Sequence, residues 1–215
     1  MGATMLQFSR LLTLNGSPRR AMPWVAEVTA YVNAHSNLTV TAWSTLFGRP
    51  VGTIAFSTIV ESHAALGAAT AGLLADNGYL DIVEKAADMV VGPPTDSLRQ
   101  LVHGGEAGGE PPALGAVAMV ISTAVAPGKQ ADAMAWGVDT AKHVTAATAV
   151  PVAFLTDLYG EFGRVTWIAL YSDFATLDKA QATLAGDAAY AKRLEKAAEL
   201  FTARSGESVL VTRVA

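Results

Sequence analysis

A carboxylate among aromatic side chains is the arrangement in this sequence that could do chemistry. Asp157 lies in a β-branched and aromatic stretch at 150–159. Alternation along strands places further side chains on its face; they are Trp43, Thr45, Phe47, Tyr159, Trp167 and Tyr171. A flat apolar ligand could stack on such walls while Asp157 accepts a phenolic or enolic proton. Burial would make Asp157 a stronger base, because desolvation disfavours an ionised carboxylate.

Two further residues are candidates for the same site. Arg10, from the first expected strand, could reach into it. His63 follows a strand that ends near Val60 and could act as an acid or base at the opening. A plainer interpretation stays open for each group: a histidine in a first helical turn is commonly solvated. The aromatics could equally fill a solid core, with Asp157 at a wet strand end.

Patterns typical of other chemistry are missing from the sequence. Asp139 and His143 stand four positions apart, but no third metal ligand lies nearby. The glycines of 104–109 lack the G-x-G-x-x-G register, and there is no P-loop, H-E-x-x-H or G-x-S-x-G pattern. Without cysteine there is no thiolate nucleophile. We therefore expect neither a metal nor another cofactor.

Composition narrows the partners. The 215 residues are 51% hydrophobic and 16% charged, enough to bury a large core. A net charge of −4, with no basic cluster beyond Arg19 and Arg20, argues against nucleic acid and anionic membrane surfaces. No apolar run approaches the roughly 20 residues of a membrane span. The expected partner is a small hydrophobic molecule, the expected location is the cytoplasm because no export signal is recognisable, and a homo-oligomer remains open.

An internal repeat organises the elements that must position these residues. The segment EKAADM at 84–89 recurs as EKAAEL at 195–200, a spacing of 111 (195 − 84). Earlier in each half the spacing is 112, as between Trp24 and Trp136 (136 − 24). A register kept over this length indicates a tandem duplication with one residue gained or lost. We expect one repeat at 1–103, a Gly/Pro-rich linker at 104–116 and a second repeat at 117–215.

Each repeat reads as β-α-β-β-α-β, the ferredoxin-like unit. The expected strands are 8–14, 38–47, 53–60 and 97–103, then 117–125, 150–159, 165–171 and 208–214. Helices lie between these strands. The second helix of each repeat is interrupted, at Asn77-Gly78 in the first repeat and at Gly186-Asp187 in the second. Such a unit covers only one face of its sheet with helices, so the other face needs a partner.

The two repeats can supply that partner for each other. The uncovered face of the second strand carries Trp43 and Thr45 in one half and Asp157 in the other, a mixture poorly suited to water. We therefore predict an α+β fold in which the two sheets close into one intramolecular barrel with a partly open interior. Asp157 replaces Thr45, and Trp167 replaces Ala55. This divergence predicts a site in one half only.

The strand-to-helix junctions at 171–177 (YSDFATL) and 60–66 (VESHAAL) resemble the dimeric α+β barrel superfamily. The resemblance covers nearly the whole chain, once in each repeat. Within the superfamily, the chain is most similar to the branch of antibiotic-biosynthesis monooxygenases and NIPSNAP-like proteins. Members usually pair two subunits to close the barrel. The functions that the resemblance implies are divided among cofactor-independent oxygenases of polyphenols, haem-degrading and haem-dependent enzymes, isomerases, cyclases and proteins with no known reaction. The pocket residues favour a protein that binds a small aromatic or polyketide-like molecule, with its oxidation or rearrangement without a metal or flavin as the expected chemistry.

Two alternatives accompany this interpretation. The first is a non-catalytic ligand-binding or assembly protein of the same fold. The second is a haem protein, because haem-degrading relatives place an axial histidine late in the second helix. The matching neighbourhoods here, near Gly78 and Ala189, contain no histidine.

Overall fold

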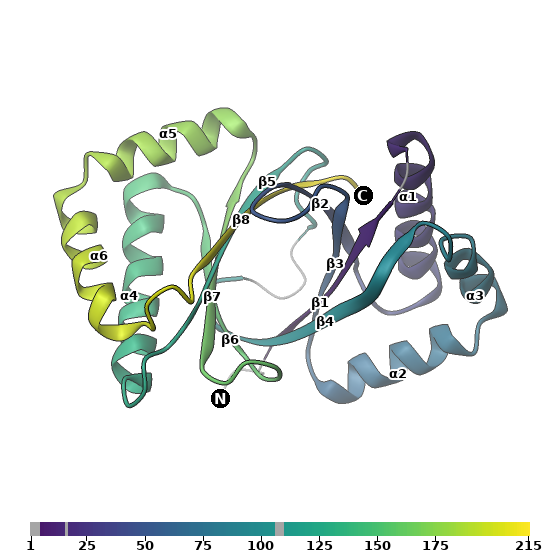
Figure 1. Ribbon diagram of the computed structural model, residues 1–215, viewed down its shortest axis with the longest axis horizontal. Coiled ribbons are helices and arrows are strands. Elements are labelled where there is room, and N and C mark those ends of the chain that lie inside the picture. The colour runs from purple at the N-terminus through teal and green to yellow at the C-terminus, as the bar shows by residue number, and fades with distance from the viewer. Residues whose placement is uncertain (1–4, 16, 106–109) are drawn as a thin grey trace.

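A closed barrel with helices outside it forms the centre of the molecule, as Figure 1 shows in a view down the barrel. The computed structural model describes residues 5–15, 17–105 and 110–215. The first repeat contains β1 (Leu6–Leu14), α1 (Pro18–His35), β2 (Thr41–Phe47), β3 (Thr53–Val60), α2 (His63–Leu74), α3 (Asn77–Glu84) and β4 (Val90–His103). The second contains β5 (Val117–Ala124), α4 (Gln130–Thr148), β6 (Val152–Asp157), β7 (Arg164–Tyr171), α5 (Phe174–Ala185), α6 (Ala188–Leu200) and β8 (Glu207–Arg213). The expected element order is confirmed in both repeats. Within the described residues, no helix is long and apolar enough to cross a membrane.

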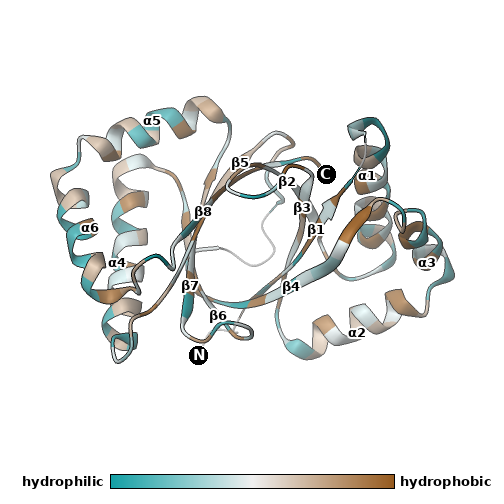
Figure 2. Ribbon diagram, viewed as in Figure 1, coloured by the Kyte–Doolittle hydropathy of each residue, from teal (hydrophilic) through white to brown (hydrophobic). Residues whose placement is uncertain are grey.

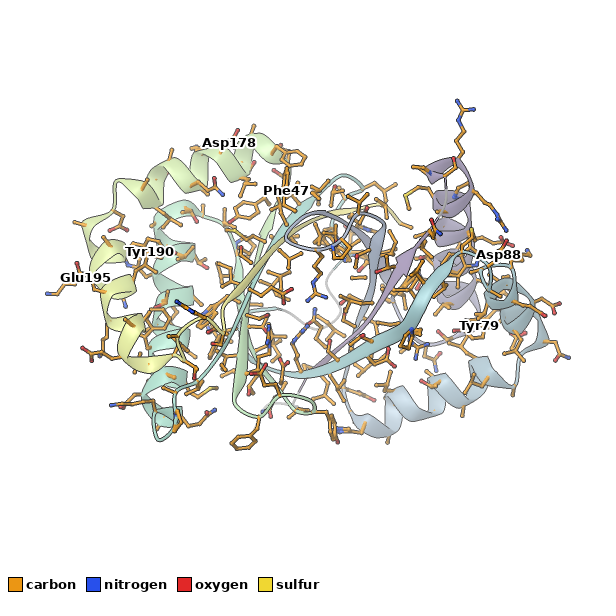
Figure 3. All side chains as sticks on the ribbon, viewed as in Figure 1. Phe47, Tyr79, Asp88, Asp178, Tyr190 and Glu195 are labelled. Carbon is orange, nitrogen blue, oxygen red and sulfur yellow. The ribbon has the colours of Figure 1, made fainter. Side chains whose placement is uncertain are left out.

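The strand order confirms one barrel built from two halves. Around the barrel it is β1-β3-β2-β8-β5-β7-β6-β4. Each repeat contributes four adjacent strands in the same order, and the halves join where β2 pairs with β8 and β4 pairs with β6. Helices α1–α3 cover one flank and α4–α6 the opposite flank (Figure 1). Tyr79 and Tyr190, at equivalent positions, lie on opposite flanks in Figure 3.

Strand β4 begins at Val90, earlier than the expected 97. The pair Pro93-Pro94 lies inside this strand. Proline cannot donate to a strand ladder, so it is confined to edges and irregularities. Here the pairing of β4 with β1 shifts register between Leu11 and Thr13. The two prolines therefore occupy an irregular part of the ladder.

Equivalent aromatic pairs anchor a helix to the outside of the sheet in each repeat. Trp24 of α1 meets Phe56 of β3 edge to face, with ring centroids 6.1 Å apart. Trp136 of α4 meets Trp167 of β7 in the same way at 5.8 Å. Trp24 and Phe56 belong to the helix-covered core of the first repeat, and Trp167 belongs to that of the second. The duplication is thus visible in the packing as well as in the strand order.

The change in repeat spacing from 112 to 111 that the sequence shows lies in the turn that joins the second and third strands of each repeat. Glycines with positive φ bound this turn at 48–52 and again at 160–163, so the second copy is one residue shorter. Trp167 is therefore equivalent to Phe56, one residue later than our sequence comparison placed it. A shift of one residue moves a side chain to the other face of a sheet. The expectation that Trp167 and Tyr171 line the interior is wrong: both pack beneath helices.

Acid is expected to weaken the fold through the carboxylates that begin α3 and α6. Asp76 accepts hydrogen bonds from the backbone N–H groups of Gly78 and Tyr79, and Asp187 is its equivalent. The Tyr31 hydroxyl also donates to Asp76 and holds the pKa of that carboxyl below its ordinary 3.8. A carboxyl group whose pKa is lower in the folded than in the unfolded state stabilises the fold at pH values above its unfolded-state pKa. This stabilisation is lost as the pH falls and the group is protonated. The Tm should therefore fall between about pH 5 and about pH 3, and less steeply in Asp76→Asn. An equal dependence of Tm on pH in the wild type and in Asp76→Asn would contradict this prediction.

Candidate functional site

Alternate residues of every strand point into the space that the barrel encloses, which we call the lumen. In β1, Leu12 belongs to the helix-covered core, so Gln7 and Ser9 point inward. In β6, Phe154 packs on the helix side, so Asp157 points inward. Directly paired residues of neighbouring strands share a face, and the register extends these assignments around the barrel.

The lumen has one polar wall. It lies on β1, β3, β4 and the end of β6, and we define it by six side chains: Gln7, Ser9, Ser57, Ser97, Arg99 and Asp157. The equivalent positions of the other repeat follow from the same ladders: Ala118, Val120, Ile168, Val209, Val211 and Thr45. All but Thr45 are aliphatic. The repeats have therefore diverged inside the barrel, as expected, but at a different set of residues.

The aliphatic side of the lumen forms its own cluster. We call it the apolar wall and define it by Ala118, Val209, Val211, Trp43, Val120, Ile168 and Leu170. Figure 2 shows the corresponding strands, β5 and β8, largely in the colours of hydrophobic residues. The indole Nε1 of Trp43 donates to the Thr41 hydroxyl at 2.9 Å, which orients the ring on this wall.

An ion pair occupies the polar wall. Arg99 Nε donates to Asp157 Oδ1 at 3.0 Å, and the two side chains are only 13% and 8% exposed. Arg99 Nη1 approaches Gln7 Oε1 at 3.4 Å, and Gln7 Nε2 donates to Ser57 Oγ at 3.2 Å. This network joins four strands. Arg99 therefore balances the charge of Asp157, and the sequence patterns did not predict this partner.

The pair keeps hydrogen-bonding capacity free for a ligand. In the described part of the chain no residue accepts a hydrogen bond from Arg99 Nη2 or donates one to Asp157 Oδ2. A buried ion pair is stable only when its remaining donors and acceptors find partners. Water, or a ligand hydroxyl that donates to Asp157 and accepts from Arg99, would meet this need.

Solvent reaches the lumen. Trp43, Val120, Ile168 and Leu170 point inward yet remain partly exposed. Strands enclose these side chains on every side, so their exposure must come from the lumen itself or from its two open ends. The interior is not the solid aromatic plug of the plainer interpretation, since Trp43 is the one aromatic residue among the members of the two walls.

A concavity of about 320 Å³ opens at the mouth where the 48–52 turn lies. Thr53 of β3 and Thr95 of β4 line it from the lumen face. The residue equivalent to Thr53 in the other repeat is Arg164, which reaches across to Glu207 at 3.3 Å, and Arg49 meets the same carboxylate at 3.0 Å. This mouth is therefore spanned by charged side chains on one side and open on the side of the polar wall.

Trp43, Thr45 and Asp157 share the lumen face, as expected; what they bind stays a prediction. Phe47 and Tyr159 do not join them. They end β2 and follow β6, and they are 69% and 64% exposed. Figure 3 places Phe47 at the edge of the barrel ring, away from its centre. The expectation that these two rings form lumen walls is wrong. A register shift between Thr45 and Phe47 pairs Phe47 with the outward-facing Leu210, and Tyr159 lies beyond the end of β6.

His63 and Arg10 also lie outside the lumen. His63 Nε2 lies 3.2 Å from the Tyr159 hydroxyl on the surface at the start of α2. Arg10 lies two residues before Leu12 in β1, so both side chains are on the outward face. There Arg10 donates two 2.8 Å hydrogen bonds to Asp96. This hydrogen bonding raises the pKa of Arg10. The expectation that Arg10 reaches into the site is wrong.

Sequence reasoning missed Arg99 and Gln7. A signal was available: Arg99 alternates with Ser97 and Leu101 along the fourth strand, and its repeat equivalent is Val211. A charged residue that replaces valine on the face opposite the helices marks a polar patch in the interior.

A groove of about 550 Å³ lies between the end of α1, the helix α2 and the sheet. Val60 and Leu38 line it from below and Ala69 from α2. At this place in the second repeat, Tyr171 stands where the first repeat has Val60. Tyr171 is 2% exposed and packs against Ala180, the equivalent of Ala69. Burial raises the pKa of the Tyr171 phenol.

Comparison with known proteins identifies the fold. No protein-family model matches the chain, and no curated protein matches its sequence. Among solved structures, a candidate monooxygenase from Fusobacterium nucleatum subsp. nucleatum has a TM-score of 0.75 at 9% identity, covering 100% of this chain and 94% of that one. An anthrone oxidase-like protein has 0.65 at 14%, covering 98% and 92%. A mutant chlorite dismutase from Candidatus Nitrospira defluvii has 0.53 at 10%, covering 97% and 91%. The chain therefore has the dimeric α+β barrel fold, with both halves in one polypeptide.

The histidines do not fit haem in the lumen. His103 pairs with Phe154, which faces the helices, so it points away from the interior. His143 bonds Asp187 at 2.7 Å, and His63 lies at the surface. His35 lines the groove, but it is stacked on Tyr31, and Nδ1 is taken by a backbone carbonyl. Among the residues that the structure describes, no cluster of three or more His, Asp or Glu could hold a metal ion.

Proposed function

We propose that this single-chain dimeric α+β barrel binds a small, flat aromatic or polyketide-like molecule in its lumen and oxygenates it. The observation that carries the proposal is the Arg99–Asp157 ion pair facing an apolar wall across the barrel. A molecule with an apolar body and one oxygen-bearing edge would satisfy both walls. The Trp43 ring offers a stacking surface worth about 0.5–1.5 kcal/mol.

The chemistry follows from the two charged groups. Asp157 removes a proton from a carbon that is acidified by a neighbouring carbonyl or phenol, and Arg99 stabilises the enolate oxygen. The carbanion gives two electrons to dioxygen and forms a C–O bond, and the resulting peroxide takes up a proton. Loss of water breaks the O–O bond and leaves a carbonyl. In sum, a CH₂ group and O₂ become C=O and H₂O, so atoms and electrons balance.

The names of two structural neighbours, a candidate monooxygenase and an anthrone oxidase-like protein, agree with this reaction class. Their identities of 9% and 14% support the fold alone. The assignment of roles to Asp157 and Arg99 therefore comes from the geometry of this chain.

Asp157→Asn is expected to slow the oxidation of anthrone, used as the probe substrate, by about 10²–10⁴-fold, the usual contribution of a general base. Dioxygen uptake and the absorbance of anthraquinone measure the rate. Asp96→Asn is the matched control, because Asp96 is an exposed carboxylate on the outer face of β4. The proposal fails if the wild-type protein leaves anthrone at its background rate, or if Asp157→Asn is as fast as wild type.

A non-catalytic carrier of a hydrophobic ligand is the second candidate function, and the groove beside α2 favours it. Its interior is apolar, with His35 and Glu61 as its only ionisable members, both exposed. Its volume of about 550 Å³ lies in the range of small-molecule sites. The same place in the second repeat already holds a phenol ring, that of Tyr171, so a ring of this size fits the architecture.

Val60→Tyr is expected to fill the groove as Tyr171 fills its equivalent. If this second function holds in place of the lumen site, the variant should lose 1-naphthol binding in calorimetric titration. In either case it should gain thermal stability, because the new ring removes apolar surface from water. Val60→Ile keeps the groove open and serves as the control. Undiminished 1-naphthol affinity in Val60→Tyr would rule the groove out as the carrier site.

A further inference from the structure

Hydroxyl groups follow the polar wall from the open mouth to the ion pair. Bulk solvent enters the mouth concavity as far as Leu11 and Thr95, which line it. One step deeper along the strands, Ser9 pairs with both Ser57 and Ser97 across neighbouring strands. One further step brings Gln7 and its partner Arg99. On the opposite wall the three serine positions are Val120, Ile168 and Val209.

The spacing of these groups suits water. Side chains two residues apart on one face of a strand lie about 6.7 Å apart, too far for a direct hydrogen bond. One water molecule between two hydroxyls spans about 5.6 Å, and flexible side chains cover the rest. At the last step Gln7 Nε2 donates to Ser57 Oγ and Gln7 Oε1 accepts from Arg99, which ties the ion pair to this line. Because an amide and a guanidinium do not relay protons, a water molecule that contacts Asp157 Oδ2 has to complete the route. Ser9, at 6% exposure, is a buried hydroxyl on this line.

We propose that Ser9, Ser57 and Ser97 hold a column of water that connects the mouth concavity to the Arg99–Asp157 pair. This inference rests on the proposed function, to which it adds the route for protons and for the water product. Asp157 releases its proton to the column, and the peroxide takes one from it, so the proton balance stays zero. The opposite side of the lumen offers no such route, because Val120, Ile168 and Val209 occupy the level of the three serines and have no hydrogen-bonding groups in their side chains.

The test is the exchange of the Arg99 Nε–H proton with solvent, followed by NMR. The double variant Ser9→Val/Ser97→Val copies Val120 and Val209 of the other repeat, so the fold has a precedent for these side chains. Its Arg99 Nε–H should exchange about tenfold more slowly than in wild type. The backbone amide of Val165, a fully buried residue of β7, serves as the reference for global opening.

Ser122→Ala is the matched control. Ser122 is a buried lumen-face hydroxyl that bonds Thr166 at 2.9 Å, away from the column. Exchange at Arg99 should be unchanged in this variant. Equal exchange rates in wild type and the double valine variant, with Val165 equally protected, would overturn the column.

Anthrone turnover separates this inference from the proposed function. Slowed Arg99 exchange together with a wild-type protein that does not oxidise anthrone would support the column and reject the reaction. Turnover that depends on Asp157, together with unaltered Arg99 exchange, would support the reaction and reject the column. If both the water column and the reaction are confirmed, the double valine variant should have a lower kcat for anthrone than the wild type and an unchanged KM.

Discussion

Arg99→Val is expected to destabilise the fold by about 3–5 kcal/mol, because it leaves Asp157 as an unpaired charge inside the barrel. Asp157 is 8% exposed and has Arg99 as its only ion-pair partner in the described residues. The free energy of unfolding in urea measures the loss. Arg10→Val is the surface comparison: it breaks a pair whose side chains are 42% and 45% exposed and should cost about 1 kcal/mol or less.

The second repeat provides a sharper control. Val211 and Thr45 pair at the place equivalent to Arg99 and Asp157. The double variant Arg99→Val/Asp157→Thr copies them, so it should recover most of the stability that Arg99→Val loses. A double variant no more stable than the single one would show that the ion pair is not what the single substitution disturbs.

Phe154→Ala is expected to cost about 3–5 kcal/mol, because it empties a fully buried site between β6 and α4. Phe154 is 0% exposed and packs in the outer core of the second repeat. Its ring lies against Gly137 of α4 so closely that a Cβ at Gly137 would overlap it. Thermal and urea unfolding should both register the loss.

The two repeats fill the contact between their first helix and second strand in opposite ways, one with a large side chain on the strand and the other with a large side chain on the helix. The equivalents of Gly137 and Phe154 are Val25 and Ala42, which are 1% and 0% exposed. Gly137→Val alone should destabilise by overpacking, by about 1–3 kcal/mol or more. Gly137→Val combined with Phe154→Ala should be more stable than the sum of the two single changes predicts. Simple additivity would contradict this view of compensated packing.

The sequence was sufficient for the architecture because the duplication and the strand alternation are long-range patterns. The repeat spacing and the element order led to one intramolecular barrel. The faces of β2 and β6 were also predictable, so Trp43, Thr45 and Asp157 could be assigned to the interior from alternation alone.

The faces of the third strands, β3 and β7, could not be assigned in this way. The repeat spacing places the missing residue only somewhere in the interval between two matching blocks, and a shift of one position decides which face of the sheet a side chain takes. Trp167 therefore went to the wrong side. Its true equivalent, Phe56, becomes apparent only when the 48–52 and 160–163 turns are seen to differ in length. Arg99 was missed because its importance depends on cross-strand pairing with β6 of the other repeat.

Titration with 1-naphthol followed by NMR is the most direct test of a ligand site in the lumen. Binding there should shift the signals of the Arg99 Nε–H and Trp43 Nε1–H groups, which lie on opposite walls. His35, on the groove outside the barrel, should stay unchanged. Shifts confined to His35 and its neighbours, or no shift at all, would contradict a binding site inside the barrel.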